Sequence, residues 1–231
     1  MKSMQKLALF DIDKTLIMGS KAKDTISFPE AFRKVYNVDA SIDIINPHGM
    51  TDQQIIIEVM RKKGLNDKEI MPKLRECMQA MIDSFSNIVE NDNIIVLDGV
   101  KDLLEELKKN NILTGLVTGN LEQIARAGLK KAGINHYFSI GGFGSDDINR
   151  TKLVHLAIKR AEQKTGFKQE DNVFLFGDAP QDVKAGKEAG IKTIGVTTGI
   201  YSKENLKDAG ADFVLENLKD KKYILDEILE R

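Results

Sequence analysis

The chain has 231 residues, of which 42% are apolar and 30% charged, and its 34 basic and 35 acidic side chains leave a formal charge of −1. This composition supports a packed core, and it excludes the strong basic charge typical of proteins that bind nucleic acid or a membrane surface. The single cysteine, Cys77, excludes an intramolecular disulfide and fits a reducing compartment. No apolar run is long enough for a signal peptide or a bilayer span, so we expect a cytoplasmic protein.

The first predicted element is a short buried strand, Lys6–Leu9, which leads into two aspartates. Asp11 and Asp13 are two residues apart, so an extended backbone can point both side chains into one crevice at the end of the strand. Like charges at this spacing repel each other, and a shared divalent cation relieves the repulsion. A polar turn is the plainer explanation of this pair taken alone.

Residues 19–93 carry helical patterns only. Pro29 suits the first turn of one helix, and Thr51 and Asp52 are candidates to cap a second. A third helix opens at Asn66 with a capping box and continues through a stripe of methionines that we interpret as core. This segment therefore predicts an all-helical unit inserted after the first strand.

From Leu97 onward, helical and strand patterns alternate. Such alternation predicts an α/β fold, a doubly wound parallel sheet with helices on both faces. We therefore predict a core formed by residues 1–18 and 94–231, with residues 19–93 as a helical insert. The further strands are expected at Ile112–Val117, Phe138–Ile140, Val173–Phe176 and Thr193–Val196, with helices near 121–132 and 151–165 between them.

Three of the predicted strands end in polar residues that can carry phosphoryl chemistry. In a parallel sheet these ends share one crevice. Asp11 can attack phosphorus as a carboxylate nucleophile, and Asp13 can exchange a proton with the leaving oxygen and with water. Asp178, and less directly Asp182, can complete an all-oxygen site for Mg²⁺.

The same crevice also offers groups that could bind a phosphate. Thr118 has a hydroxyl, and Gly119 and Asn120 offer backbone N–H groups at the start of a helix. A cation to neutralise the phosphate is expected from Arg150 or Lys152, which lie at the start of the helix predicted near 151–165. Lys152 is our first choice. An exposed charge at a helix start is the alternative for either residue.

Together these motifs resemble the haloacid dehalogenase-like hydrolase superfamily. The matching residues are D-x-D-x-T-L from Asp11 to Leu16, the threonine at 118, the basic residue near 150, and G-D-x-x-x-D from Gly177 to Asp182. Within this superfamily the chain is most similar to phosphoglycolate phosphatase-like members, in which a helical cap lies between the D-x-D-x-T-L motif and the threonine motif. The resemblance implies a Rossmann-like core and a cap that excludes water during the reaction.

What the resemblance implies for function is a Mg²⁺-dependent phosphatase that acts on a small phosphorylated metabolite through a phospho-Asp11 intermediate. Asp13 would be the acid/base, and its backbone carbonyl, rather than its side chain, would bind the metal with Asp11, Asp178 and Asp182. His48 lies in the insert, where related enzymes place residues that read the substrate, and a plain helix-capping loop is the alternative. One departure is Lys14, where the family usually has glycine.

Three rival functions stay open. A phosphomutase similar to β-phosphoglucomutase would use the same carboxylates and require a bisphosphorylated sugar. A phospho-accepting module similar to response-regulator receivers would be shorter and lack the helical insert, and a non-catalytic binding protein would not need every acid. We expect neither nucleic acid nor membrane as a partner, and a monomer or a homodimer fits equally well.

Overall fold

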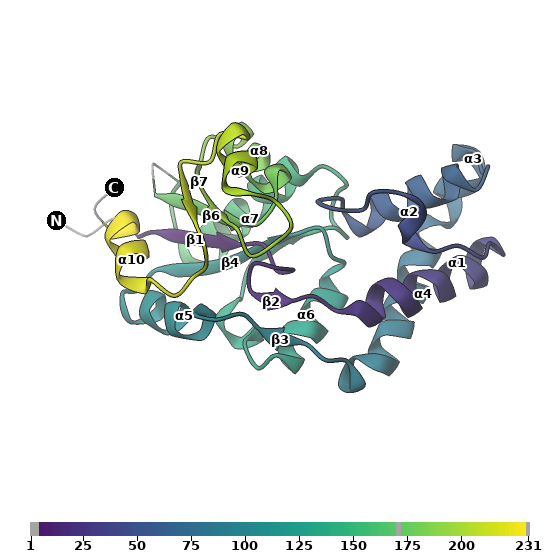
Figure 1. Ribbon diagram of the computed structural model, residues 1–231, viewed down its shortest axis with the longest axis horizontal. Helices are drawn as coiled ribbons and strands as arrows, with labels where there is room; N and C mark the ends of the chain where they lie inside the picture. Colours follow the sequence, from purple (N-terminus) through teal and green to yellow (C-terminus); the bar gives the residue numbers. More distant parts are fainter. Residues whose placement is uncertain (1–4, 170–171, 230–231) are drawn as a thin grey trace.

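The computed structural model describes residues 5–169 and 172–229. A sheet with helices on both sides forms one part of the molecule, and a separate group of helices stands beyond the carboxyl ends of its strands (Figure 1). Within the described residues, none of the helices combines the length and the apolar character needed to cross a bilayer.

The main sheet has six strands, all parallel, with the first strand of the chain near its centre. This arrangement confirms the predicted doubly wound fold, and it puts β1 between two strands that come much later in the sequence. The spatial order is β5 (Gly141–Phe143), β4 (Leu113–Thr118), β1 (Leu7–Phe10), β6 (Val173–Gly177), β7 (Lys192–Val196) and β8 (Phe213–Leu215).

Helices cover both faces of this sheet, because its strands are apolar on both sides. Three helices share a hydrophobic cluster on one face, and two others share the cluster on the opposite face, while α9 (Lys203–Asp208) packs against β7 and β8. The first group is α5 (Val100–Lys109), α6 (Glu122–Lys131) and α10 (Lys221–Leu229), and the second is α7 (Arg150–Thr165) and α8 (Pro180–Glu188).

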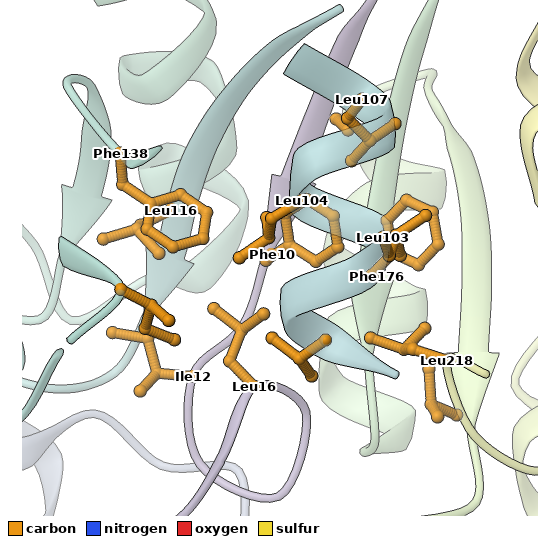
Figure 2. Close-up of a cluster of buried hydrophobic side chains, with 14 of the residues drawn as sticks. Phe10, Ile12, Leu16, Leu103, Leu104, Leu107, Leu116, Phe138, Phe176 and Leu218 are labelled. Atoms are coloured by element: carbon orange, nitrogen blue, oxygen red, sulfur yellow. The ribbon is translucent and has the colours of Figure 1, made fainter. Parts of the chain in front are cut away.

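The core holds the strand that leads into the two aspartates. Phe10, the last residue of β1, is paired in register with Leu116 of β4 and Phe176 of β6. Its ring stacks on that of Phe176, with ring centroids 4.6 Å apart, and α5 packs its leucines over both (Figure 2). The residues that follow β1 therefore start from a rigid position.

The helical group has a hydrophobic cluster of its own, which also includes Ile124 of α6 and Leu121, the residue just before this helix. Of the methionine stripe in the third predicted helix, Met81 is fully buried and Met78 is partly buried against this cluster, in agreement with the core interpretation. A two-stranded antiparallel ribbon, β2 (Ile17–Met18) and β3 (Ile95–Val96), lies where the chain enters and leaves this group. The helices are α1 (Phe28–Tyr36), α2 (Asp52–Lys62), α3 (Asp67–Ile70) and α4 (Leu74–Ile88).

Two sequence predictions of individual elements were wrong. The third helix of the insert is two helices, α3 and α4, because Pro72 between them lacks the N–H that a continuous helix needs. The strand expected at Phe138–Ile140 lies at Gly141–Phe143, where a Cβ on Gly142 would come within 2.1 Å of the Leu153 carbonyl oxygen. Glycine there lets α7 pack closely. The division into residues 19–93 and the two core segments stays a prediction.

Candidate active site

The carboxyl ends of three adjacent strands face a cavity of about 290 Å³ between the sheet and the helical group. Asp11 follows β1, Thr118 ends β4 and Asp178 follows β6, and all three side chains line this cavity. The helical group contributes further lining residues from α2 and from the loop before it. The site therefore lies where an open α/β sheet is expected to bind ligands.

Asp11, Asp178 and Asp182 form a buried acidic cluster, in which one carboxylate oxygen from each lies within 4.8 Å of the others. Asp182 lies in the first turn of α8, where its second oxygen accepts a hydrogen bond from the Ala179 N–H at 3.2 Å. Burial is the main cause that raises the pKa of Asp11 well above its usual value, and the negative charge of Asp182 is the second. The same two causes, in the same order, raise the pKa of Asp178 to about 7. Positive charge is needed to keep these groups ionised.

Part of that charge comes from Arg150, the first residue of α7. Its guanidinium lies 3.4 Å from an Asp11 oxygen and also donates a hydrogen bond to Asp182. Burial opposes the charge on Arg150, but Asp182 and Asp11 raise its pKa above its ordinary value. Arg150 is thus the basic residue that contacts the acidic cluster.

Lys152, our first choice from the sequence, lies elsewhere. Its side chain is 67% exposed, its ammonium pairs with Asp147 at 3.0 Å, and it does not line the cavity. Residues two apart on a helix project about 200° apart around the axis, so Arg150 and Lys152 cannot both face the crevice. The geometry therefore favours Arg150 over Lys152 as the cation beside Asp11, and its role in a reaction stays a prediction.

The Asp13 carboxylate is not part of the acidic cluster and is 39% exposed. The Asn120 side-chain amide donates to one of its oxygens at 2.8 Å, and the Lys23 ammonium lies 3.7 Å from the same oxygen. Asp13 is thus oriented by two neighbours at the mouth of the cavity, where it can exchange protons with a bound molecule.

The loop after β4 is held tightly by the helical group. A Cβ on Gly119 would lie 2.5 Å from the Met50 carbonyl oxygen, so only glycine permits this approach. The Gly119 carbonyl accepts from the Asp52 N–H at 2.8 Å, and the Leu121 N–H donates to the Asp52 carboxylate at 2.9 Å. The Leu121 N–H at the start of α6 is thus taken by a carboxylate of the protein itself, whereas the Asn120 N–H, one of the two expected to bind phosphate, donates to the Thr118 hydroxyl at 3.3 Å.

Two cavity-lining residues in the helical group were missed from the sequence. Lys23 is only 8% exposed, and its ammonium donates to the Asn120 side-chain oxygen and lies 3.4 Å from Asp52. Asp52 was noted only as a capping candidate, whereas Thr51 is the residue that caps α2, with Gln54 completing the capping box. The sequence around Lys23 has no unusual spacing or composition that would identify it, because its partners are distant in the chain.

His48 lies in the loop before α2 and lines the cavity, although it is an exposed residue. Its backbone carbonyl accepts a hydrogen bond from the Gln181 side chain of α8 at 3.1 Å, which joins this loop to the sheet side of the cavity. Partial burial and the charge of Lys14 lower the His48 pKa, which favours the neutral imidazole. The predicted position of His48 near a bound molecule agrees with this geometry, and its role stays a prediction.

The charges around the cavity are suited to a divalent cation. Six aspartates and four basic side chains line the cavity, so a dication would balance the formal charge. The clustered oxygens of Asp11, Asp178 and Asp182 are the hard ligands that such an ion prefers. Burial raises the pKa of all three carboxyl groups, and repulsion from Asp182 raises those of Asp11 and Asp178 further, so a bound cation would favour their ionised forms. The donor set therefore fits a divalent metal.

Comparison with known proteins agrees with the motifs and the geometry. The model of the haloacid dehalogenase-like hydrolase family matches residues 8–196, a range that begins in the first strand and includes the helical group and the three later motifs. The chain belongs to this family. The resemblance drawn from the aspartate, threonine and G-D-x-x-x-D motifs is thereby confirmed.

Curated relatives of the whole chain are named as phosphatases. A pyrophosphatase (PpaX) of Oceanobacillus iheyensis is 29% identical over 216 residues, which cover 92% of each chain. A phosphoglycolate phosphatase of Vibrio cholerae is 26% identical over 219 residues, covering 94% of this chain and 95% of the relative. Among solved structures, one described as a predicted phosphatase from Clostridium acetobutylicum superposes with a TM-score of 0.71 at 21% identity, over 97% of this chain and all of the other. That likeness shows a shared fold.

Proposed function

We propose that the chain is a Mg²⁺-dependent phosphatase that hydrolyses a small phosphorylated metabolite through a phosphorylated Asp11. The observation that carries this proposal is the buried Asp11 carboxylate in contact with Arg150, beside Asp178 and Asp182, with Asp13 oriented at the mouth of the same cavity. Family membership and the phosphatase names of its relatives give independent support. The cavity volume suits a small molecule rather than a polymer.

In the first step, an Asp11 oxygen attacks phosphorus and the bond to the leaving oxygen breaks, while Asp13 gives that oxygen its proton. Arg150 neutralises part of the negative charge beside the nucleophile. In the second step, Asp13 takes a proton from water, the water oxygen attacks phosphorus, and phosphate leaves with Asp11 regenerated. The Asn120 amide keeps Asp13 in one orientation for both transfers.

We place Mg²⁺ on carboxylate oxygens of Asp11, Asp178 and Asp182, with the Asp13 backbone carbonyl as a further ligand implied by the family resemblance. When bound, the ion supplies charge stabilisation for the phosphoryl oxygens. Thr118 and the adjoining Gly119 and Asn120 line the same cavity and are proposed to contact the phosphoryl group.

Phosphate release from a panel of phosphorylated compounds tests this function. The panel contains phosphoglycolate, sugar phosphates, nucleotides and pyrophosphate, each assayed with Mg²⁺ and with a chelator. We expect release from one class of compound, and we expect the chelator to abolish it. Turnover that requires a bisphosphorylated sugar would indicate the mutase instead, and no release from any compound would overturn the proposal.

A further inference from the structure

The backbone of Lys14 has an unusual conformation next to the acid/base. Lys14 follows Asp13 directly and has a φ of 62°, in the left-handed region that favours glycine. The other non-glycine residues with positive φ in the described ranges are Asn37 and Asn111, and asparagine adopts this conformation readily. A lysine there is strained, and strain that persists in a binding site points to a function.

Hydrogen bonds at both the N–H and the carbonyl of Lys14 hold its backbone in this conformation. The Lys14 N–H donates to the Ile17 carbonyl at 2.7 Å, and its carbonyl accepts a hydrogen bond from the Thr198 hydroxyl. The side chain is therefore projected from a rigid anchor rather than from a flexible loop. A glycine would satisfy both backbone bonds without strain, so only the side chain can explain the lysine.

That side chain is half-buried and lines the cavity between the helical group and the acidic cluster. Its charge affects the pKa of a residue in the helical group and of one in the acidic cluster. It contributes to lowering the pKa of His48 in the loop before α2, and it opposes the burial that raises the pKa of Asp178. Lys14 thus lines the same cavity as His48 of the helical group and Asp178 of the proposed metal site.

The Lys14 ammonium is also uncommitted, unlike two other cations of the cavity. Arg150 is paired with Asp11 and Asp182, and Lys23 is paired with three aspartates. Among the ion pairs of the part of the chain that the structure describes, none involves Lys14. A half-buried positive charge without a partner is available to a ligand.

We propose that Lys14 is a specificity-determining residue whose ammonium binds a second anionic group on the substrate, beyond the phosphoryl group that is transferred. This inference rests on the proposed phosphatase function and narrows it to a substrate class. Because Lys14 adjoins the residue that protonates the leaving oxygen, the second anion lies within a few bonds of that oxygen. The substrate is then a small phosphorylated compound with a carboxylate or a second phosphoryl group on its leaving side.

Matched substrate pairs test the inference. Phosphoglycolate is compared with 2-hydroxyethyl phosphate, in which a neutral hydroxymethyl group replaces the carboxylate, and pyrophosphate is compared with methyl phosphate. We expect Lys14→Gln to lower kcat/KM about tenfold or more, mainly through KM, for the doubly anionic member of one pair. The neutral members should change less than about threefold, and Lys14→Arg should retain most of the preference. The pair that responds identifies the anion as carboxylate or phosphoryl.

Two control variants separate charge and strain from recognition. Lys34→Gln removes an exposed lysine of α1 that does not line the cavity, and it should leave both pairs unchanged. Lys14→Gly removes the charge and the strain together, so it should lose the preference while its thermal midpoint stays equal or rises. Asn111→Gly, at a φ of 56° away from the cavity, shows what relief of the backbone alone does.

If Lys14→Gln lowers kcat/KM equally for both members of each pair, Lys14 acts on the metal or the nucleophile, and the inference is overturned. An unchanged kcat/KM for all four substrates overturns it as well. A binding measurement keeps the test independent of turnover. In the Asp11→Asn background, calorimetry with phosphoglycolate and pyrophosphate should show binding about tenfold weaker or more after Lys14→Gln for one of them. If wild-type protein releases no phosphate but this difference is found, only the proposed function fails; unchanged or absent binding overturns the role of Lys14.

Discussion

The Lys23 ammonium lies 3.4 Å from an Asp52 carboxylate oxygen, and both side chains are buried at the boundary between the helical group and the sheet. Burial alone would lower the Lys23 pKa, but Asp52 and two further aspartates raise it above its ordinary value. The other Asp52 oxygen accepts from the Leu121 N–H, and Lys23 also bonds to Asn120. This pair therefore ties the insert to the loop that orients Asp13.

Removal of Lys23 should destabilise the protein strongly, because the Asp52 carboxylate would stay buried without its ion-pair partner. We expect Lys23→Ala to lower the free energy of unfolding by about 3–5 kcal/mol, measured by urea denaturation. The matched control is the exposed pair of Arg33 and Asp39, which are 3.1 Å apart. Arg33→Ala should cost less than about 1 kcal/mol. Similar losses for the buried and exposed pairs would contradict this interpretation.

The two basic residues at the start of α7 should differ sharply in their effect on activity. Arg150→Gln removes the guanidinium beside Asp11 and Asp182, and we expect kcat/KM for phosphate release to fall about 100-fold or more. Lys152→Gln removes an exposed charge that pairs with Asp147, and we expect less than about a threefold change. Circular dichroism checks that both variants remain folded. A larger loss for Lys152→Gln would restore the choice made from the sequence.

Sequence reasoning located the candidate active site at the carboxyl ends of the strands, because local patterns encode these ends. Asp11 and Asp178 each follow a short apolar strand, and parallel strands bring such ends together whatever their distance along the chain. The choice between Arg150 and Lys152 depends on the rotation of α7 about its axis, which packing against the sheet decides. Periodicity in the sequence was too weak to fix that rotation.

The residues that sequence reasoning missed are those with only long-range partners. Lys23 is an ordinary lysine in the sequence, and its burial becomes visible only when Asp52 and Asn120, 29 and 97 residues later, are brought beside it. The conformation of Lys14 is likewise a property of the folded loop. The sequence showed a lysine in place of the family's usual glycine, but not which way its side chain points.

The stability of the metal-free protein should fall as pH rises from about 4 to about 7. With its pKa raised to about 7, Asp178 holds a proton in the folded state that the unfolded chain, with a pKa near 3.8, has already released. The folded state therefore binds more protons over this window and loses stability with rising pH, by an amount on the order of 2–4 kcal/mol. Urea denaturation in the presence of a chelator, at several pH values, measures this change.

Two comparisons check that the acidic cluster causes this pH dependence of stability. Asp178→Asn should flatten the pH dependence of the metal-free protein, and Mg²⁺ should raise the thermal midpoint more at pH 8 than at pH 5, because protons compete with the ion. Stability that rises with pH over this window in the metal-free protein would show that the cluster is not strained by its own charge.

Substitution of the nucleophile should have opposite effects on activity and on stability. Asp11→Asn removes the attacking oxygen, so we expect phosphate release to fall by about 10⁴-fold or more. It also removes one buried negative charge from a crowded cluster, so the free energy of unfolding of the metal-free variant at pH 8 should rise by about 1 kcal/mol or more. A variant that lost activity merely through misfolding would be less stable, so this combination separates a catalytic role from a structural one. Activity that survives Asp11→Asn would rule out Asp11 as the nucleophile.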